Sequence, residues 1–150
     1  MIAFDTNILV YAEDPAEPSG KHKRAADLLA TAGKIDAVIP IQVLGEFVNV
    51  CRKKKITDVE KITAKVEDFS RIFETPHSSV ADITDAAMLA EKHRIQFFDA
   101  LIVVITRRAG TTILISEDMQ DGLEIDGLKI VNPFATANDT FLADYLGSVL

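Results

Sequence analysis

The chain has 150 residues, 48% apolar and 26% charged, which is the size and composition of one globular domain with a substantial core. No stretch reaches the ~20 uncharged apolar residues of a membrane span, and the single cysteine, Cys51, excludes an internal disulfide and a cysteine-built zinc site. The net charge of −7 argues mildly against nucleic-acid binding, because phosphate-binding surfaces are usually basic. The N-terminus also lacks the basic and apolar regions of a secretion signal, so a cytoplasmic protein is expected.

The first half of the chain alternates short apolar runs with helical patterns. It predicts a strand at 1–5, a helix starting at Asp5-Thr6-Asn7, a loop at 15–20, a helix at 21–31 and a strand at 37–39. Pro40 suits the first turn of a helix at about 41–54. One face of that helix is apolar and consists of Ile41, Leu44, Val48 and Cys51. A narrow polar stripe consists of Gln42, Glu46, Asn49 and Lys53. We therefore expect the helix to be buried over most of its circumference.

The second half continues the alternation. Helices are predicted at 57–73 and 82–94, and a third starts at Asp99 or its neighbours and ends at Gly110. Strands are predicted at 112–115 and 128–131, separated by a polar turn, and a last amphipathic helix at 138–146 with Asn138 as its cap. Short apolar strands that alternate with helices indicate a parallel sheet covered on both faces.

Four acidic residues stand where the chain is otherwise apolar: Asp5, Glu46, Asp99 and Asp118. Asp5 and Asp118 follow predicted strands, and open α/β sheets bind ligands at the carboxyl ends of their strands. Each residue taken alone has a plainer interpretation, since Asp5 and Asp99 could be helix caps and Glu46 a solvated residue on a polar face.

The four residues together favour a shared site. Carboxylates gathered within ~5 Å repel one another by on the order of 3 kcal/mol per pair at an effective dielectric of ~20, unless a cation or protons offset their charge. An all-oxygen set of ligands favours Mg²⁺ or Mn²⁺ over zinc. Two such cations would bring the formal charge of −7 to about −3. The residues alone thus predict a metal-binding α/β domain.

A family resemblance extends this interpretation. Five segments occur in the order of the PIN domain: Asp5-Thr6-Asn7, Gly45-Glu46-Phe47, Phe98-Asp99-Ala100, Ser116-Glu117-Asp118 and Val131-Asn132-Pro133-Phe134. The chain resembles the VapC-like ribonuclease toxins of type II toxin–antitoxin systems. This resemblance implies a three-layer α/β/α domain with a doubly wound parallel sheet of about five strands, the first and fourth adjacent, so that Asp5 and Asp118 meet. We assign the PIN domain to residues 1–134 and a helical extension, packed on the same domain, to 135–150.

The resemblance implies Mg²⁺- or Mn²⁺-dependent hydrolysis of RNA phosphodiester bonds. One or two ions would be held by Asp5, Asp99 and Asp118, and Glu46 would complete the catalytic set as a ligand or through a water. Thr6, Asn7 and Ser116 would orient ligands, waters or phosphate. Because many relatives have threonine at the position of Ser116, and Asp121 precedes Gly122, the fourth acidic position is Asp118, Asp121 or both.

Further expectations concern the binding partners. Lys53 lies on the stripe of Glu46 and could approach the RNA backbone, although a solvated helix end is the plainer interpretation. The family resemblance implies a homodimer and a VapB-like antitoxin, which would insert an Arg or Lys into the acidic pocket or lay a helix in an apolar groove. The alternative function is a non-catalytic PIN-scaffold module. A phosphoacceptor enzyme is less favoured, because Asn7 stands where such phosphatases usually need a second aspartate.

Overall fold

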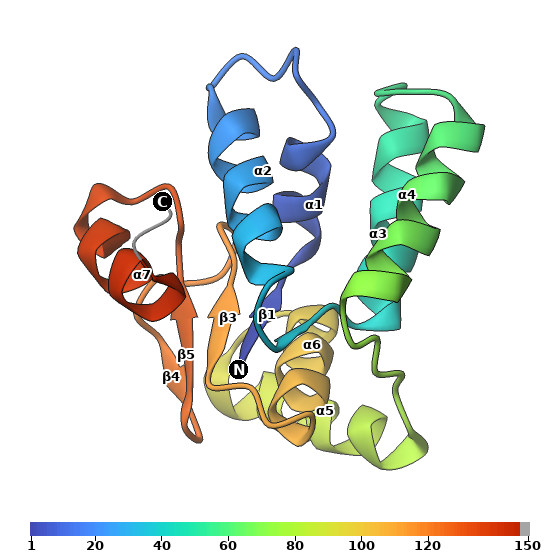
Figure 1. Ribbon diagram of the computed structural model, residues 1–150. Helices are drawn as coiled ribbons and strands as arrows, with labels where there is room; N and C mark the ends of the chain where they lie inside the picture. The colour runs from blue at the N-terminus through green and yellow to red at the C-terminus, as the bar shows by residue number, and fades with distance from the viewer. Residues whose placement is uncertain (148–150) are drawn as a thin grey trace.

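The structure, a computed structural model, describes residues 1–147 and is built on one five-stranded sheet with the strand order β2-β1-β3-β5-β4 (Figure 1). The strands are β1 (Ile2–Phe4), β2 (Ala37–Val38), β3 (Ile113–Ile115), β4 (Glu124–Ile125) and β5 (Leu128–Val131). β2, β1, β3 and β5 pair in parallel, whereas β4 pairs antiparallel with β5. The predicted α/β class with a five-stranded sheet is confirmed, and the sheet is parallel as predicted except for β4.

Two details of the predicted sheet are wrong. β1 neighbours β2 and β3, so the strand that leads to Asp118 is the third strand in sequence and not the fourth. The short strand β4 was not predicted, and it forms a hairpin with β5 through Asp126-Gly127. Both turn residues have positive φ, 47° and 87°, which is the conformation that Asp-Gly favours in a two-residue hairpin. β4 was missed because two residues are too few to show a hydrophobic period.

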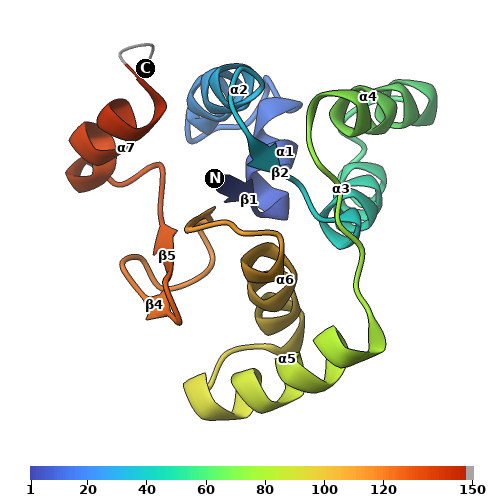
Figure 2. The same ribbon diagram turned by 60° about the horizontal axis from the view of Figure 1, so that its bottom comes forward.

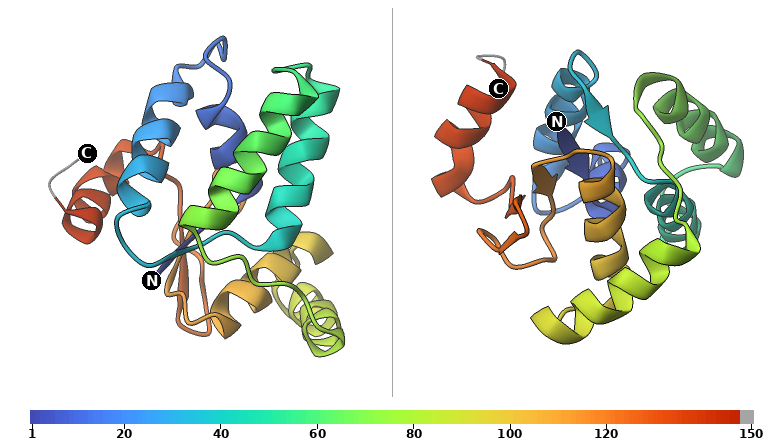
Figure 3. Two further views of the ribbon diagram at one scale, coloured as in Figure 1. Left: turned by 45° about the vertical axis from the view of Figure 1, so that its right-hand side comes forward. Right: turned by 90° about the horizontal axis from the view of Figure 1, so that it is seen from below.

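Seven α-helices cover the sheet within the described part of the chain: α1 (Thr6–Ala12), α2 (Lys21–Ala32), α3 (Ile41–Lys53), α4 (Val59–Ile72), α5 (Val80–His93), α6 (Phe97–Arg108) and α7 (Asp139–Leu146). Figure 2 shows α1 and α2 on one side of β1, and α6 with α5 on the other. α3 packs on α1, and α4 packs on α3 (Figure 3). The predicted three-layer arrangement is confirmed.

Helix α5 begins two residues before its predicted start, and α6 begins in the region predicted around Asp99. Ser79 caps α5: its hydroxyl accepts from the backbone N–H of Asp82, and the Asp82 carboxylate accepts from the backbone N–H of Ser79. This reciprocal capping box starts the helix at Val80. α6 begins at Phe97, so Asp99 lies in its first turn and is not its cap. The carboxylate of Asp99 is therefore not used by a helix end.

Helix α3 carries Glu46 and buries a narrower face than expected. Its buried residues are Val43, Leu44, Phe47 and Cys51, at helical spacing. Ile41, predicted on the buried face, is 50% exposed. An α-helix turns about 100° per residue, so Ile41 lies roughly 200° around the axis from Val43. The prediction that α3 is buried over most of its circumference is therefore wrong.

The predicted C-terminal helix forms as α7, after a 3₁₀ turn at Thr136–Asn138. α7 buries Leu142 and Leu146, and its Tyr145 hydroxyl accepts from the N-terminal ammonium at 2.8 Å. Asn138 stands at the N-cap position, but its side chain makes no cap hydrogen bond. The proposed boundary at residue 134 stays a prediction. Among residues 1–147 no helix combines the length and the hydropathy needed to cross a bilayer.

Candidate functional site

The central strands bring the first and last acidic segments to one edge of the sheet. β1 and β3 run parallel, with Phe4 opposite Ile115, and the backbone N–H of Asp5 donates to the carbonyl of Ile115 at 2.9 Å. Asp5 follows β1 directly, and Asp118 lies three residues beyond β3. Both carboxylates thus lie at the carboxyl ends of adjacent parallel strands, where α/β sheets bind ligands.

The buried carboxylate of Asp5 accepts hydrogen bonds from two donors. One oxygen accepts from the backbone N–H of Thr6 and the other from the Ser116 hydroxyl, each at 2.7 Å. Burial raises the pKa of Asp5 to about 6, and the nearby negative charges of Asp99 and Asp118 add to the rise. The two hydrogen bonds stabilise the charged form but do not outweigh the burial.

Asp99 extends the group from α6. It is half-buried, and its pKa is raised by burial and then by the charges of Asp118 and Glu46. The charge of Asp118 therefore disfavours the ionised forms of both Asp5 and Asp99, and the charge of Glu46 adds to the effect on Asp99. The structure brings together side chains from the end of β1, from α3, from α6 and from the segment after β3.

Glu46 is aimed at the group by two polar neighbours. The Thr6 hydroxyl donates to one of its carboxylate oxygens at 2.9 Å, and the Gln42 amide donates to the other at 2.9 Å. The same amide nitrogen contacts the carbonyl of Phe98 at 3.4 Å. Since both partners are acceptors, the amide orientation of Gln42 is fixed. Gln42 therefore ties α3 to the first turn of α6.

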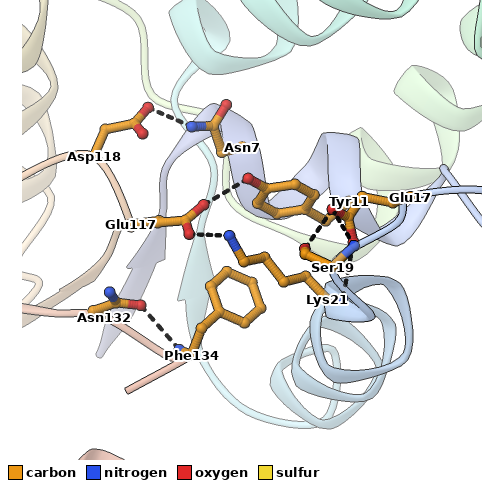
Figure 4. A network of polar contacts seen from close by, with 9 residues as sticks. All are labelled: Asn7, Tyr11, Glu17, Ser19, Lys21, Glu117, Asp118, Asn132 and Phe134. Atoms are coloured by element: carbon orange, nitrogen blue, oxygen red, sulfur yellow. Dashed lines mark hydrogen bonds and ion pairs between the residues drawn. The ribbon is translucent and has the colours of Figure 1, made fainter.

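Asp118 is held by a hydrogen bond from α1 and by the contacts of the adjacent residue, Glu117. The Asn7 amide donates to the Asp118 carboxylate, as Figure 4 shows. The adjacent Glu117 accepts from the Tyr11 hydroxyl at 2.6 Å and pairs with Lys21. Lys21 in turn lies 5.1 Å from the centre of the Tyr11 ring. These contacts fix the segment after β3 against α1 and α2.

Asp121 and Lys53 do not join this group. The Asp121 carboxylate accepts from the backbone N–H of Asn132 at 2.8 Å and from the Asn138 amide at 3.0 Å, so it anchors the chain after β5. Of the alternatives that the sequence left open, Asp118, Asp121 or both, the geometry favours Asp118 alone. Lys53 is exposed in the last turn of α3, which agrees with its plainer interpretation.

The donor set fits a hard divalent cation. It consists of carboxylate oxygens whose mutual repulsion is not offset by any lysine or arginine: no ion pair of residues 1–147 includes one of the four acids. Their partners are hydroxyl and amide groups. In the same part of the chain no three acidic, histidine or cysteine side chains already surround one metal position. Asn7 and Gln42 each donate one hydrogen bond to a carboxylate of the group, to Asp118 and Glu46 respectively, and a carboxylate keeps further lone pairs for a cation.

Sequence reasoning missed several residues around the site. Gln42 was placed only on the polar stripe of α3, although its spacing of four from Glu46 permits a side-chain contact within one helix. The contacts of Glu117 with Tyr11 and Lys21 could not be predicted from the sequence, because they join segments about 100 residues apart. Such contacts follow from the fold and not from local spacing.

The parallel sheet with acidic residues at one edge defines an α/β domain with a candidate cation site. The PIN domain family matches residues 2–120, well over half of the sequence, and the chain belongs to this family. No curated protein matches the sequence.

Three solved structures share the fold. Mycobacterium tuberculosis VapC20, described as a toxin that cleaves the sarcin–ricin loop, is 19% identical with a TM-score of 0.66, over 79% of this chain and 90% of that chain. A toxin–antitoxin complex from Klebsiella pneumoniae is 20% identical with a TM-score of 0.67, over 89% and 98%. VapBC2 from Rickettsia felis, bound to a DNA fragment from its promoter, is 21% identical with a TM-score of 0.62, over 87% and 97%.

Proposed function

We propose that the protein is a Mg²⁺- or Mn²⁺-dependent endoribonuclease and the toxin of a toxin–antitoxin pair. The observation that carries this proposal is the convergence of four carboxylates at one edge of the sheet, from Asp5, Glu46, Asp99 and Asp118. The pKa values of Asp5 and Asp99 are raised, and no ion pair of residues 1–147 includes any of the four. PIN family membership and the VapC likeness support RNA as the substrate.

Each residue has a distinct task in this proposal. A bound divalent cation would supply charge neutralisation at the phosphate and acidify an attacking water. Asp5, Asp99 and Asp118 would hold it, and Glu46 would serve as a further ligand or orient a water. Ser116 and Thr6 donate to Asp5 and Glu46, respectively, and so fix the direction of their carboxylates.

The decisive assay is cleavage of RNA by the purified protein with Mg²⁺, with Mn²⁺ and with EDTA. We expect cleavage only with a cation, and a loss of about 100-fold or more in Asp5→Asn and Asp99→Asn. Asp36→Asn, which removes an exposed carboxylate, is the matched control and should cleave normally. Undiminished cleavage in EDTA, or by both site variants, contradicts the proposed mechanism.

The competing function is a non-catalytic module on the PIN scaffold. It is favoured by one observation, that no three potential ligands within residues 1–147 already surround a metal position. Calorimetric titration with Mn²⁺ separates the two functions. The nuclease requires saturable binding that Asp99→Asn abolishes, whereas the module requires none.

An antitoxin helix would fit an apolar groove between α2 and α4. The groove has a volume of about 430 Å³ and is lined mainly by apolar side chains, among them Leu29, Phe69, Ile72 and Phe73. Ile72 is more than half exposed at its rim. The apolar face of an amphipathic helix would cover this surface. The toxin–antitoxin complexes among the structural neighbours support such a partner.

The partner proposal is tested by co-expression with the neighbouring gene product, followed by purification and light scattering. We expect a complex of a toxin homodimer with its antitoxin, and a weaker complex in Ile72→Asp, which places a charge in the groove. Glu60→Gln, on the exposed face of α4, is the control. A monomer that binds nothing would contradict both the antitoxin and the homodimer.

A further inference from the structure

Phe98 is an aromatic side chain left in solvent. It is 62% exposed, and no other Phe or Tyr of residues 1–147 is more than half exposed. Phe141, at 36%, stacks on Tyr145 and lies under the Lys129 ammonium. Single exposed apolar residues are common on protein surfaces, so exposure alone carries no function. The place of Phe98 in the fold is what distinguishes it.

Phe98 lies at the rim of the acidic group. It immediately precedes Asp99 in the first turn of α6, with the two Cα atoms about 3.8 Å apart. Its carbonyl accepts from the Gln42 amide, which also donates to Glu46. The ring of the neighbouring Phe97 packs edge-on against Phe98, with centroids 5.2 Å apart and planes at 73°. Phe97 itself packs on the core, so the ring of Phe98 stands on a fixed base.

We propose that Phe98 is a stacking platform for an unpaired base next to the phosphate bound at the acidic group, and that it makes the protein select single-stranded RNA. This inference rests on the proposed ribonuclease function. Bases in a duplex are already stacked and cannot lie on an external ring, whereas an unpaired base can. Stacking is also a source of affinity that does not depend on positive charge. A chain with a net charge of −7 needs such a source to hold a polyanion.

The test uses a short single-stranded RNA that carries 2-aminopurine in turn at each position around the cleaved bond. We expect binding to quench the probe at one position in the wild type, because stacking quenches its fluorescence. Phe98→Ala should remove this quenching and raise the KM for cleavage about 5-fold to 150-fold, the range of base stacking on an aromatic ring. The kcat should change little, because Phe98 contacts no reacting atom.

Conservative variants separate stacking from apolar contact. Phe98→Trp keeps an aromatic face and should retain quenching and KM, whereas Phe98→Leu keeps apolar volume and should behave like Phe98→Ala. Met88→Ala is the matched control, because Met88 is 75% exposed and lies near Val104 and Arg107, toward the far end of α6. It should leave both measurements unchanged.

Abasic substitution at the quenched position completes the experiment. It should raise the KM of the wild type but not that of Phe98→Ala, because the ring and the base form one interaction. If the abasic substitution and Phe98→Ala raise the KM independently of each other, the inference is overturned. A changed oligomeric state of Phe98→Ala with unchanged quenching would also overturn it, because it would show that a protein surface covers the ring. Quenching without cleavage would refute the proposed ribonuclease and retain the stacking site. Cleavage with unchanged KM and quenching in Phe98→Ala would support the proposed ribonuclease and refute the stacking site.

Discussion

Replacing Asp5 by asparagine should abolish activity and yet stabilise the metal-free protein at neutral pH. The pKa of Asp5 is raised to about 6 in the folded protein, first of all by burial, against 3.8 when the side chain is unperturbed. The folded chain therefore binds this proton more tightly than the unfolded chain. Stability is highest where Asp5 is protonated in both states and falls as pH rises from about 4 through about 6.

The size of the effect follows from the same two pKa values. Ionising Asp5 in the folded state costs about 3 kcal/mol of stability above pH 6, at about 1.4 kcal/mol per pKa unit. Asparagine avoids this cost but cannot reproduce both hydrogen bonds, from Thr6 and from Ser116, and that loss is worth about 1 kcal/mol. The net gain for Asp5→Asn is about 2 kcal/mol at neutral pH. For a chain of this length it corresponds to a rise in Tm of roughly 4–8 °C.

The assay is thermal unfolding of both proteins in EDTA from about pH 4 to about pH 7.5. Asp5→Asn should be slightly less stable than the wild type at the acidic end and more stable at the neutral end, with the curves crossing between. Adding Mg²⁺ should raise the Tm of the wild type but not that of the variant, since only the wild type keeps the proposed ligand. Asp36→Asn should follow the wild type throughout.

Two results would refute this reasoning. A difference in Tm that does not depend on pH would show that Asp5 does not hold a proton more tightly in the folded state. A variant that is less stable than the wild type at neutral pH would show that the hydrogen bonds of the carboxylate outweigh its burial.

The remaining predictions concern the scaffold. Phe47→Ala should lower the free energy of unfolding by about 3–5 kcal/mol, because the ring is fully buried, whereas Ile41→Ala on the exposed side of α3 should change it by less than about 0.5 kcal/mol in urea titrations. Burial alone would raise the pKa of Asp82, but its bonds to Ser79 and Arg108 lower it. Asp82→Asn should therefore cost about 1–3 kcal/mol at neutral pH, a loss that shrinks on acidification below about pH 4. Burial raises the pKa of Cys51 to about 11, so a thiol reagent should label it at least about 100-fold faster in denaturant than in the folded protein.

The fold was largely predictable because its signals are local. Apolar runs and helical spacing identified four of the five strands and all seven α-helices among the described residues, with ends displaced where a cap decided them. Ser79 is an example, because its capping box with Asp82 starts α5 earlier than the apolar spacing suggests. The order of the strands was predicted less well. Pairing of β1 with β3 joins residues far apart in sequence and leaves no local trace.

The candidate site was predictable in its acidic residues and not in their surroundings. A carboxylate in an apolar run, such as Asp99, is conspicuous because burying it is costly. Gln42 and Glu117 are ordinary polar residues on helix and loop, and only the fold shows which carboxylate or hydroxyl each one meets. The exposure of Phe98 was equally hidden, since a run of apolar residues around it suggests burial throughout.

The pairing of β1 with β3 also sets when the acidic group can exist during synthesis. Ile2 pairs with Ile113, and Asp118 follows Ile113 in the chain. Asp5 must therefore wait until the residues between it and Asp118 have been synthesised before the two carboxylates can lie together. Ribosomes add about 5–20 residues per second, so this wait lasts seconds. A nascent chain therefore carries no assembled acidic group until Asp118 has been synthesised, and the proposed activity cannot begin before that point.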